Sequence, residues 1–243
     1  MGAAVLAAKG ALRGGVGKLT VSSPKWGYQI LQTAVPEAMY RNNRGDACLT
    51  EIHPERDFSA IAIGPGIGTN EMTVKALEDF LSSIDKPVIL DADALNCIAL
   101  RPAMLNNIPI LSVMTPHAGE FDRMFGPQPS SEARLRKAIE MAKYYNILII
   151  LKGRYTAIVR PDGKIYFNSS GCPAMATPGS GDVLTGLLLA MMAQGYPAEI
   201  ASIIAVYIHG VAGEMAQAEH GEYGVTAGDI AANIGRAIRE TMK

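Results

Sequence analysis

Residues 175–188 read MATPGSGDVLTGLL, a turn of small residues followed by an apolar run. The apolar side chains after the turn recur at helical spacing, which predicts a helix that starts near Asp182. A glycine-rich turn that leads into a helix directs free N–H groups outward, and such groups favour phosphate. We therefore predict that Gly179, Ser180 and Gly181 line an anion site at the start of a buried helix.

Asp182 has two interpretations at this position. It can accept the proton of a substrate hydroxyl while the neighbouring N–H groups hold the phosphoryl group that is transferred. It can equally be the cap of an ordinary helix start. This stretch alone does not separate the two, whereas the rest of the chain favours the catalytic interpretation.

The residues upstream of the turn predict an α/β fold. Short apolar runs rich in Ile and Val are predicted strands, at residues 60–63, 87–90, 108–113 and 147–151. Continuous apolar runs are typical of a parallel sheet that is covered on both faces. Helical patterns separate these runs, most clearly at 71–83 and 131–145. We therefore expect a mainly parallel central sheet with helices on both faces.

Weaker local signals complete this expected fold. They predict a helix over 1–13, a strand over 19–22, a helix over 28–35 and an irregular stretch over 41–58. Asp162-Gly163 lies between two further apolar runs, and this pattern predicts a hairpin of strands 157–160 and 164–167.

Unusual residues follow each of the four predicted sheet strands. They are Gly64-Pro65-Gly66-Ile67-Gly68, Asp91-Ala92-Asp93, Thr115-Pro116-His117-Ala118-Gly119-Glu120 and Lys152-Gly153. Ligands of open parallel sheets bind beyond the carboxyl ends of the strands. We therefore expect these clusters to form one site together with the turn before Asp182.

Each cluster also has a structural alternative. The loop 64–68 lacks the lysine of a P-loop and the spacing of a dinucleotide fingerprint, so a tight turn competes with a ligand loop. A lone histidine is more often structural, but the neighbours of His117 favour a ligand contact. Residues 152–156 offer a cation and a hydroxyl to a nucleotide, against a solvated lysine at a strand end. Asp91 and Asp93 are candidates for Mg²⁺ contact or for capping a helix, so we assign no metal ligand.

Composition narrows the class of protein. The 243 residues are 49% hydrophobic and 19% charged, with a formal net charge of −1, so a large core is expected. This balance indicates neither a nucleic-acid nor a membrane-surface partner. Cys48, Cys97 and Cys172 are odd in number and widely spaced, which favours a reducing compartment over disulfides or zinc. No apolar run reaches about 18 residues and no secretory signal is recognisable, so we expect a cytoplasmic protein.

Together these motifs resemble the nucleotide-dependent NAD(P)H-hydrate dehydratases, a branch of the ribokinase-like superfamily that is often fused behind an epimerase domain. The resemblance covers essentially the whole chain, through residues 2–8, 64–68, 90–95, 115–121, 151–156 and 175–186. The last of these motifs is typical of the superfamily, and its combination with the motifs around His117 and Lys152 points to the dehydratase branch. The resemblance implies a ribokinase-like α/β fold.

The resemblance also implies a metabolite-repair reaction. NADH or NADPH takes up water at the nicotinamide ring, and the enzyme phosphorylates the resulting hydroxyl from ADP, or from ATP in some members, with Mg²⁺. Phosphate then leaves and NAD(P)H is restored, with AMP as the other product when ADP is used. A homotetramer is the family-level expectation.

The residues of this chain that match the family's motifs inherit expected roles from the resemblance. Ala3, Gly66, His117 and Asp182 are expected to contact the hydrated dinucleotide, with Asp182 as the catalytic base. The adenine nucleotide is expected at Lys152, Gly153, Arg154, Tyr155, Thr156, Gly179, Ser180 and Gly181.

The chain departs from the family pattern at three points. Cys172 and Ala174 stand where members usually carry Asn and Gly. Pro178 stands where Gly is frequent, and because proline has no N–H it removes one donor from the turn. Family members have a strand and a Gly-Ser turn before the segment that matches residues 1–3. We therefore expect residues 1–243 to form a single dehydratase domain that lacks the family's first strand.

Two alternative functions use the same residues. A small-molecule kinase of the same superfamily, such as a vitamin-precursor kinase, needs the same Asp182 and the same anion site. A non-catalytic dinucleotide-binding module belongs to a different class, but pure binding needs no base at Asp182.

Overall fold

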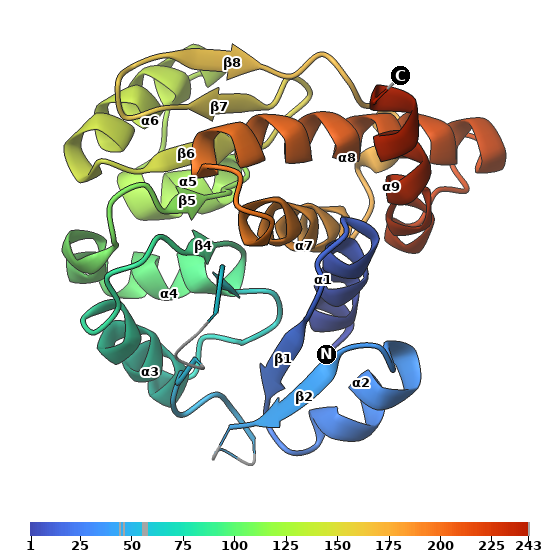
Figure 1. The fold of residues 1–243 in the computed structure, drawn as a ribbon. Coiled ribbons are helices and arrows are strands. Elements are labelled where there is room, and N and C mark those ends of the chain that lie inside the picture. Colours follow the sequence, from blue (N-terminus) through green and yellow to red (C-terminus); the bar gives the residue numbers. More distant parts are fainter. Residues whose placement is uncertain (44, 46, 55–57, 243) are drawn as a thin grey trace.

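The centre of the molecule is a sheet with strand order β3-β4-β5-β6-β7-β8, seen in a computed structural model that describes residues 1–43, 45, 47–54 and 58–242. The strands are Ala62–Ile63 (β3), Ile89–Leu90 (β4), Val113–Met114 (β5), Leu148–Leu151 (β6), Ala157–Val159 (β7) and Ile165–Phe167 (β8). β3 to β6 are parallel, whereas β7 and β8 are antiparallel to their neighbours. The predicted α/β fold with a mainly parallel sheet is confirmed (Figure 1).

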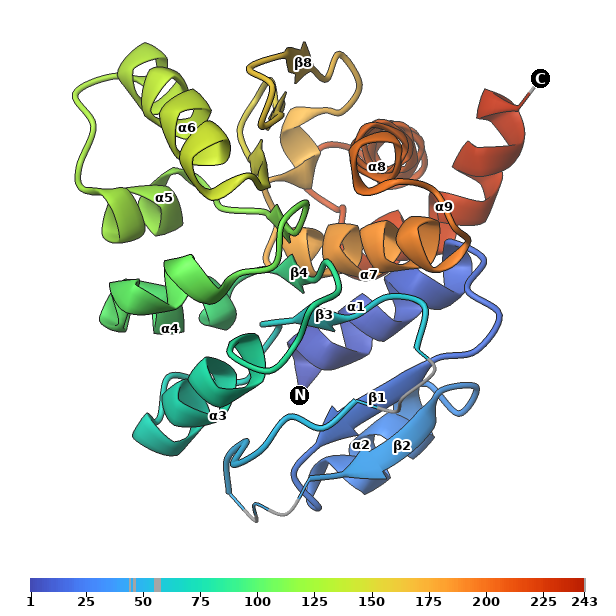
Figure 2. The same ribbon diagram turned by 60° about the vertical axis from the view of Figure 1, so that its left-hand side comes forward.

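Helices cover both faces of this sheet because successive strand residues point to opposite sides. On β4, Ile89 packs into one core and Leu90 into the other. The first core is shared with Ser180–Ala193 (α7), Ala198–His220 (α8) and Ala227–Thr241 (α9). The second core is shared with Glu71–Leu81 (α3), Asp93–Leu100 (α4), Ala118–Phe125 (α5) and Ser131–Tyr145 (α6). Figure 2 shows the two sets of helices on opposite sides of β3 and β4.

A small α/β unit lies apart from the central sheet. Its strands Thr20–Ser23 (β1) and Met39–Asn42 (β2) pair in parallel, and Gly27–Ala34 (α2) connects them. Leu19, Val35 and Ala38 of this unit pack in a third core with Ala8 and Ala11 of the first helix, Gly2–Arg13 (α1). The unit is therefore attached to the body of the protein through α1, as the lower part of Figure 2 shows.

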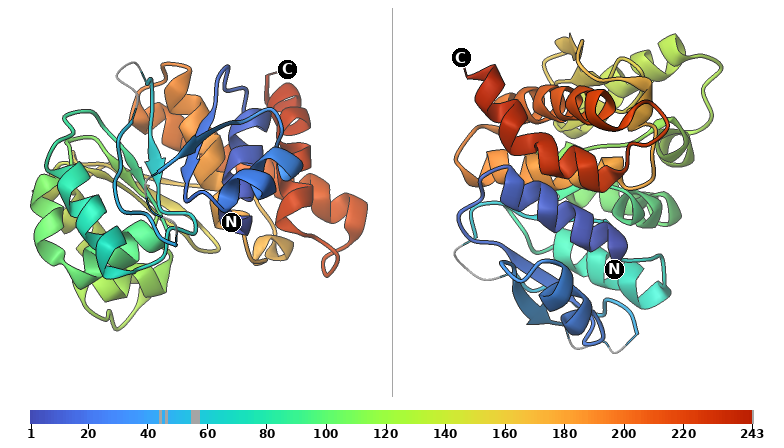
Figure 3. Two further views of the ribbon diagram at one scale, coloured as in Figure 1. Left: turned by 90° about the horizontal axis from the view of Figure 1, so that it is seen from below. Right: turned by 90° about the vertical axis from the view of Figure 1, so that its right-hand side faces the viewer.

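Helices α1 and α7 pack parallel, with their backbones in close contact. A methyl group on Gly186 would lie 1.9 Å from the carbonyl oxygen of Ala7, and one on Gly10 would lie 2.4 Å from that of Val183. Only glycine permits this approach. Because Leu6 of α1 contacts the turn at Gly179, the N-termini of both helices lie at the same end of the molecule. The right panel of Figure 3 shows α1 beside α9, which it also contacts.

Most of the predicted elements are confirmed. The helix over 131–145 is observed with those bounds, and the helix over 1–13 ends before Gly14 as expected. The hairpin around Asp162-Gly163 is formed by β7 and β8. The helix expected to begin near Asp182 begins at Ser180.

Two predictions in the first half of the chain were wrong. Only Val113 of the predicted strand 108–113 is in a strand, because Leu111 adopts a left-handed backbone (φ 60°) that interrupts an extended chain. The strand β2 was not predicted, and its end overlaps the expected irregular stretch 41–58. Residues 44, 46 and 55–57 of that stretch lie outside the described residues.

The helix α8 is long and apolar enough, by length and composition alone, to cross a bilayer. Half of its apolar window is buried, and Ala201, Ala205 and Ala212 belong to the core shared with α7 and α9. Its apolar residues therefore have a packing role within this domain.

Candidate active site

A buried charged cluster lies where the parallel strands end. Asp91 follows β4 and Lys152 follows β6, and the Lys152 Nζ atom lies 2.8 Å from the Asp91 Oδ1 atom. Thr185 of α7 donates a hydrogen bond of 2.6 Å to the other carboxylate oxygen of Asp91. Glu120 Oε2 lies 3.8 Å from the same lysine amine. The Asp91 side chain is 1% exposed, so the pairing with Lys152 and Thr185 compensates a carboxylate that has lost its water.

The glycine-rich turn lies directly above this cluster. Gly179 is the N-cap of α7 and adopts a left-handed backbone (φ 88°), which glycine adopts without strain. A methyl group on Gly181 would lie 3.2 Å from the Lys152 amine. The positive end of α7 and the lysine charge therefore act at the same place, which is suited to a phosphate. The Ser180 N–H is used within the turn, donating to the carbonyl of Thr177 at 3.3 Å.

Asp182 lies in the first turn of α7 and titrates unusually. Burial, followed by the negative charge of Asp91, raises the pKa of Asp182 to about 6, against a smaller opposing effect of Lys152. Asp93 and Glu120 add to the upward shift. A carboxylate with a pKa near 6 is ionised at neutral pH and is a stronger base than a free aspartate. This property suits a group that must take a proton from a hydroxyl.

His117 is the N-cap of α5. Its Nδ1 atom accepts hydrogen bonds from the N–H groups of Gly119 and Glu120, at 3.0 and 3.2 Å, and Glu120 accepts from the His117 N–H in return. This capping box fixes Nδ1 as the acceptor and leaves Nε2 to carry the proton of the neutral ring. The Nε2 atom lies 3.5 Å from Glu120 Oε1, and because the His117 side chain is 52% exposed, a ligand can also reach the Nε2–H. The structural role and the predicted ligand contact are therefore compatible.

The loop after β3 lies beside the start of α1. The Cβ atom of Ala3 is 3.3 Å from the position that a methyl group on Gly66 would occupy, so these two predicted substrate residues are brought together. Gly64 is required by packing, since its methyl group would lie 1.7 Å from the Asp91 carbonyl oxygen. Asp93 accepts a hydrogen bond of 2.9 Å from the Gly68 N–H.

The alternative that an aspartate caps α4 was wrong. The N-cap of α4 is Ala92, and no side chain caps the helix. Asp93 is the first residue of α4, and Asp91 is engaged by Lys152 and Thr185.

The predicted nucleotide segment 152–156 forms a short closed loop. The Lys152 N–H donates to the Pro116 carbonyl at 2.9 Å, which links this loop to the one that carries His117. The Thr156 hydroxyl donates to the Gly153 carbonyl at 3.2 Å. Between them the Arg154 guanidinium lies 5.3 Å from the centre of the Tyr155 ring, which is 63% exposed. The loop thus presents a cation and an aromatic ring to solvent next to Lys152.

Sequence reasoning missed two residues of the site. Thr185 lies in the quoted motif, and its helical spacing from Gly181 signals a side chain near the turn, but its partner Asp91 is distant in sequence. His209 of α8 is buried, and its Nε2 atom lies 3.4 Å from the Ser180 hydroxyl oxygen. Burial lowers the pKa of His209 to about 4, so it is neutral at physiological pH. A histidine inside an apolar helix was the only available signal.

Among the described residues, no group of three His, Cys, Asp or Glu side chains is arranged to hold an ion, so a contact of Asp91 or Asp93 with Mg²⁺ stays a prediction.

Comparison with known proteins identifies relatives over nearly the whole chain. The sequence profile of the NAD(P)H-hydrate dehydratase family matches residues 1–236. The ADP-dependent (S)-NAD(P)H-hydrate dehydratase of Bacillus subtilis is 37% identical over 232 residues, with 94% of this chain and 81% of that protein covered. The bifunctional NAD(P)H-hydrate repair enzyme Nnr of Moorella thermoacetica is 35% identical over 240 residues, with 94% of this chain covered. The chain spans 45% of that relative, about half its length.

Solved structures agree with this relationship. The crystal structure of the Bacillus subtilis ADP/ATP-dependent NAD(P)H-hydrate dehydratase, co-crystallised with ATP and Mg²⁺, superposes with a TM-score of 0.84 at 34% identity, covering 98% of this chain and 84% of that one. The ribokinase of Thermotoga maritima, at 13% identity and a TM-score of 0.61 over 96% of this chain and 86% of its own, shares the fold. On this profile match and these identities, the chain belongs to the NAD(P)H-hydrate dehydratase family and has the ribokinase-like fold.

Proposed function

We propose that this chain dehydrates hydrated NADH and NADPH, with ADP or ATP as the phosphoryl donor. The observation that carries the proposal is the position of Asp182, a carboxylate with a raised pKa in the first turn of α7, over the Lys152–Asp91 pair. The family relationship supports the same reaction, since the Bacillus subtilis relative is named as the ADP-dependent dehydratase.

The reaction follows from the chemistry of these groups. The hydroxyl oxygen of the hydrated ring attacks the terminal phosphorus of the nucleotide, and Asp182 takes the hydroxyl proton as the new O–P bond forms. The free N–H groups at the start of α7 and the Lys152 amine stabilise the charge that develops on the phosphoryl oxygens. AMP departs when ADP is the donor. The C–O bond then breaks, phosphate takes the electron pair, and loss of a ring proton restores the dihydronicotinamide.

The remaining site residues have binding roles in this proposal. Ala3, Gly66 and His117 contact the hydrated dinucleotide, and the half-exposed Nε2–H of His117, beside Glu120 Oε1, is the donor to it. Lys152 and the loop 153–156 contact the adenine nucleotide, together with the Gly179–Gly181 turn. When bound with the nucleotide, Mg²⁺ would neutralise part of the charge on the phosphates. We assign it no protein ligand.

We further infer that residues 1–243 act as one catalytic domain, as a homotetramer in the cytoplasm. Analytical ultracentrifugation of the purified chain measures the assembly state directly. A monomer at micromolar concentration would contradict the tetramer without affecting the proposed reaction.

The reaction is tested by incubating the protein with hydrated NADH, ADP and Mg²⁺. We expect the dihydronicotinamide absorbance to return, with one AMP and one inorganic phosphate released per NADH restored. A stable phosphorylated product without free phosphate would instead identify a small-molecule kinase. Binding of the hydrate without any turnover would identify a non-catalytic module. Replacing ADP with ATP in the same assay establishes which donor is preferred.

A further inference from the structure

An open aromatic pocket lies on the small β1-α2-β2 unit. It has a volume of about 570 Å³ and is lined by Lys25, Trp26, Tyr28, Gln29, Tyr40 and Asn42. Trp26 is the only tryptophan of the chain, yet 51% of it is exposed, as is 51% of Tyr28. Large aromatic side chains are usually buried, so an exposed pair that lines one pocket indicates a ligand surface.

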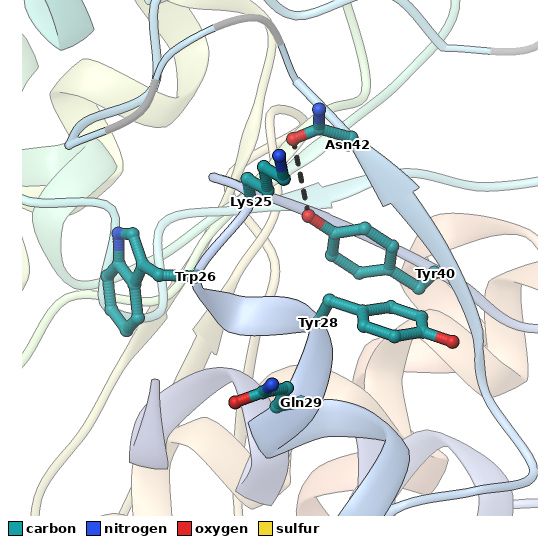
Figure 4. Close-up of a pocket in the computed structure, with 6 residues that line it drawn as sticks. All are labelled: Lys25, Trp26, Tyr28, Gln29, Tyr40 and Asn42. Atoms are coloured by element: carbon teal, nitrogen blue, oxygen red, sulfur yellow. Dashed lines mark hydrogen bonds between the residues drawn. The ribbon is translucent and has the colours of Figure 1, made fainter.

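The lining combines aromatic faces with polar groups. Tyr28 and Tyr40 pack edge to face, with ring centres 5.1 Å apart. The Tyr40 hydroxyl is held by the carbonyl oxygens of Ser23 and Pro24, at 3.2 and 3.1 Å, which fixes its ring. Figure 4 shows Lys25 and Asn42 near the Tyr40 hydroxyl and Trp26 on the opposite side. The pocket therefore has a pre-formed aromatic wall.

Lys25 adds a positive charge to this wall. Among the residues that the structure describes, no carboxylate lies within ion-pair distance of its amine. Aromatic faces beside an unpaired cation and side-chain amides suit a ligand that joins a planar heterocycle to an anionic group. A nucleobase with its sugar phosphates has this chemistry.

The pocket is linked to the active site through the start of α1. A methyl group on Gly27, which follows Trp26, would lie 2.9 Å from the terminal carbon of Met1. Ala3 lies against Gly66, and Leu6 lies against Gly179 of the anion turn. Met1, Ala3 and Leu6, at the start of α1, thus lie against Gly27 beside the pocket residues Trp26 and Tyr28, against the substrate loop and against the phosphate turn. A ligand with one end at Asp182 can extend past Ala3 toward Trp26.

We propose that this pocket binds the adenosine half of the hydrated dinucleotide, with the base against the aromatic side chains and Lys25 paired with a phosphate of that half. The inference rests on the proposed function, which places the nicotinamide half at Asp182. A dinucleotide consists of two nucleotides, and the site around Asp182 accounts for one of them. The pocket supplies a second place, and the start of α1 connects it to the turn before Asp182.

The single tryptophan makes the pocket directly observable. We would titrate the protein with adenosine 2′,5′-bisphosphate, the adenosine half of NADPH, and follow Trp26 fluorescence. The matched probe is nicotinamide mononucleotide, the other half. We expect saturable quenching by the first probe and none by the second. Equal quenching by both, or by neither, overturns the proposal.

Variants establish where the probe binds. Tyr28→Ala and Lys25→Gln are each expected to raise the Kd for the probe, read from the quenching curve, by about tenfold. This is the effect of losing roughly one stacking or charge-assisted contact. Tyr144→Ala and Lys143→Gln are the controls, since they remove an exposed tyrosine and an exposed lysine from α6. Quenching that is unchanged in both pocket variants contradicts the proposal. The quenching must also persist in Asp91→Asn/Lys152→Met, and its loss there would place the probe at the nucleotide site instead.

The combined results of the quenching and turnover assays separate this inference from the proposed function. The dependence of Trp26 emission on protein concentration separates it from self-association. The quenching probe undergoes no reaction, so quenching without any return of NADH counts against the proposed function alone. Return of NADH without quenching counts against the pocket alone. If a second copy of the chain covers the pocket, Trp26 emission shifts with protein concentration and the probe causes no quenching, which also overturns the proposal.

Discussion

The amine of Lys152 lies 2.8 Å from a carboxylate oxygen of Asp91, and these two residues follow different strands of the sheet. Asp91 is almost fully buried, and its second oxygen accepts from Thr185 of α7. The protein therefore fixes the lysine charge beneath the glycine-rich turn before any ligand arrives. A cation held in place by the fold loses little freedom when a phosphate binds, which favours binding and catalysis alike.

Removing the lysine tests both of its roles. We expect Lys152→Ala to lose about 3–5 kcal/mol of unfolding free energy, because a buried carboxylate is left without its partner. Asp91→Asn/Lys152→Met removes both charges, so it should recover much of that stability while ADP binding stays about 1–3 kcal/mol weaker than in the wild type. Chemical denaturation measures the free energy of unfolding and calorimetry measures the free energy of ADP binding, on the same preparations. Wild-type affinity for ADP in the double variant would exclude Lys152 from the nucleotide site.

Asp182→Asn tests whether Asp182 is the catalytic base. The alternative that Asp182 caps the helix was wrong, because the N-cap of α7 is Gly179 and no side chain caps it. Asparagine keeps the shape of the side chain but cannot take the proton. We expect turnover of hydrated NADH to fall by roughly 10²–10⁴, the usual contribution of a positioned acid–base group, with ADP binding retained. Turnover within a few-fold of the wild type would show that Asp182 is not the base. A parallel collapse of binding would assign it to ligand holding.

The raised pKa of Asp182 predicts a pH dependence of activity. The base must be ionised to act, so kcat should fall as the pH drops below about 6. Protonation of free ADP also affects such a profile, so the ADP concentration is kept saturating at each pH. A wild-type kcat that is constant from pH 5 to pH 8 would contradict the assigned base.

The same pKa predicts a pH dependence of stability with a definite sign. A carboxyl whose folded pKa is raised binds its proton more tightly in the folded state. Its contribution to stability is therefore lost as the pH rises from 3.8 to about 6. Asp182→Asn should be more stable than the wild type at pH 7 by about 1–2 kcal/mol, a figure reduced for partial exposure. The difference should vanish near pH 4. Denaturation at both pH values measures it, and a less stable variant at pH 7 would contradict the prediction.

His209 predicts the opposite trend. Its folded pKa is lowered from 6.5 to about 4, so the unfolded chain binds its proton more readily. Stability should fall by up to about 3 kcal/mol as the pH drops from 6.5 to 4. Because Asp182 titrates in an overlapping range, the comparison belongs in the Asp182→Asn background. There, adding His209→Gln should flatten the slope of unfolding free energy against pH. An unchanged slope would show that the histidine is not the group responsible.

Close helix packing predicts the effect of one methyl group. Gly186→Ala places its Cβ 1.9 Å from the Ala7 carbonyl oxygen, so α1 and α7 must separate. We expect a loss of about 2–4 kcal/mol of unfolding free energy, in the range of overpacked cores. Gly235→Ala in α9 is the matched control, since nothing lies within 4 Å of its added methyl group. It should gain about 0.5–1 kcal/mol from helix propensity alone.

Sequence patterns predicted the central sheet, and the site residues at the carboxyl ends of its strands, better than they predicted the helices and strands outside that sheet. The clusters at Gly64, Asp91, His117 and Lys152 could be placed together because parallel strands present their carboxyl ends on one side. The apolar runs before them predicted burial on both faces. These inferences needed only local patterns and one topological rule.

Local sequence patterns could not predict contacts between residues that are far apart in the sequence. Thr185 and Asp91 are 94 residues apart, and Ser180 and His209 meet across two helices. The capping role of His117 was accessible in principle, since Glu120 follows at the spacing of a capping box. The missed strand β2 lacks a strong apolar pattern because its side chains are only partly buried.

The tight seam between α1 and α7 also has a consequence for how the chain matures. The two helices are joined at their far end by a hydrogen bond from Gln194 to the Gly14 carbonyl, across 180 residues. Synthesis proceeds from the N-terminus, so α1 emerges from the ribosome long before its partner exists. Its glycine-lined surface cannot be covered before α7 has been synthesised. Until then the first helix lacks the partner that buries it and is accessible to proteases and chaperones.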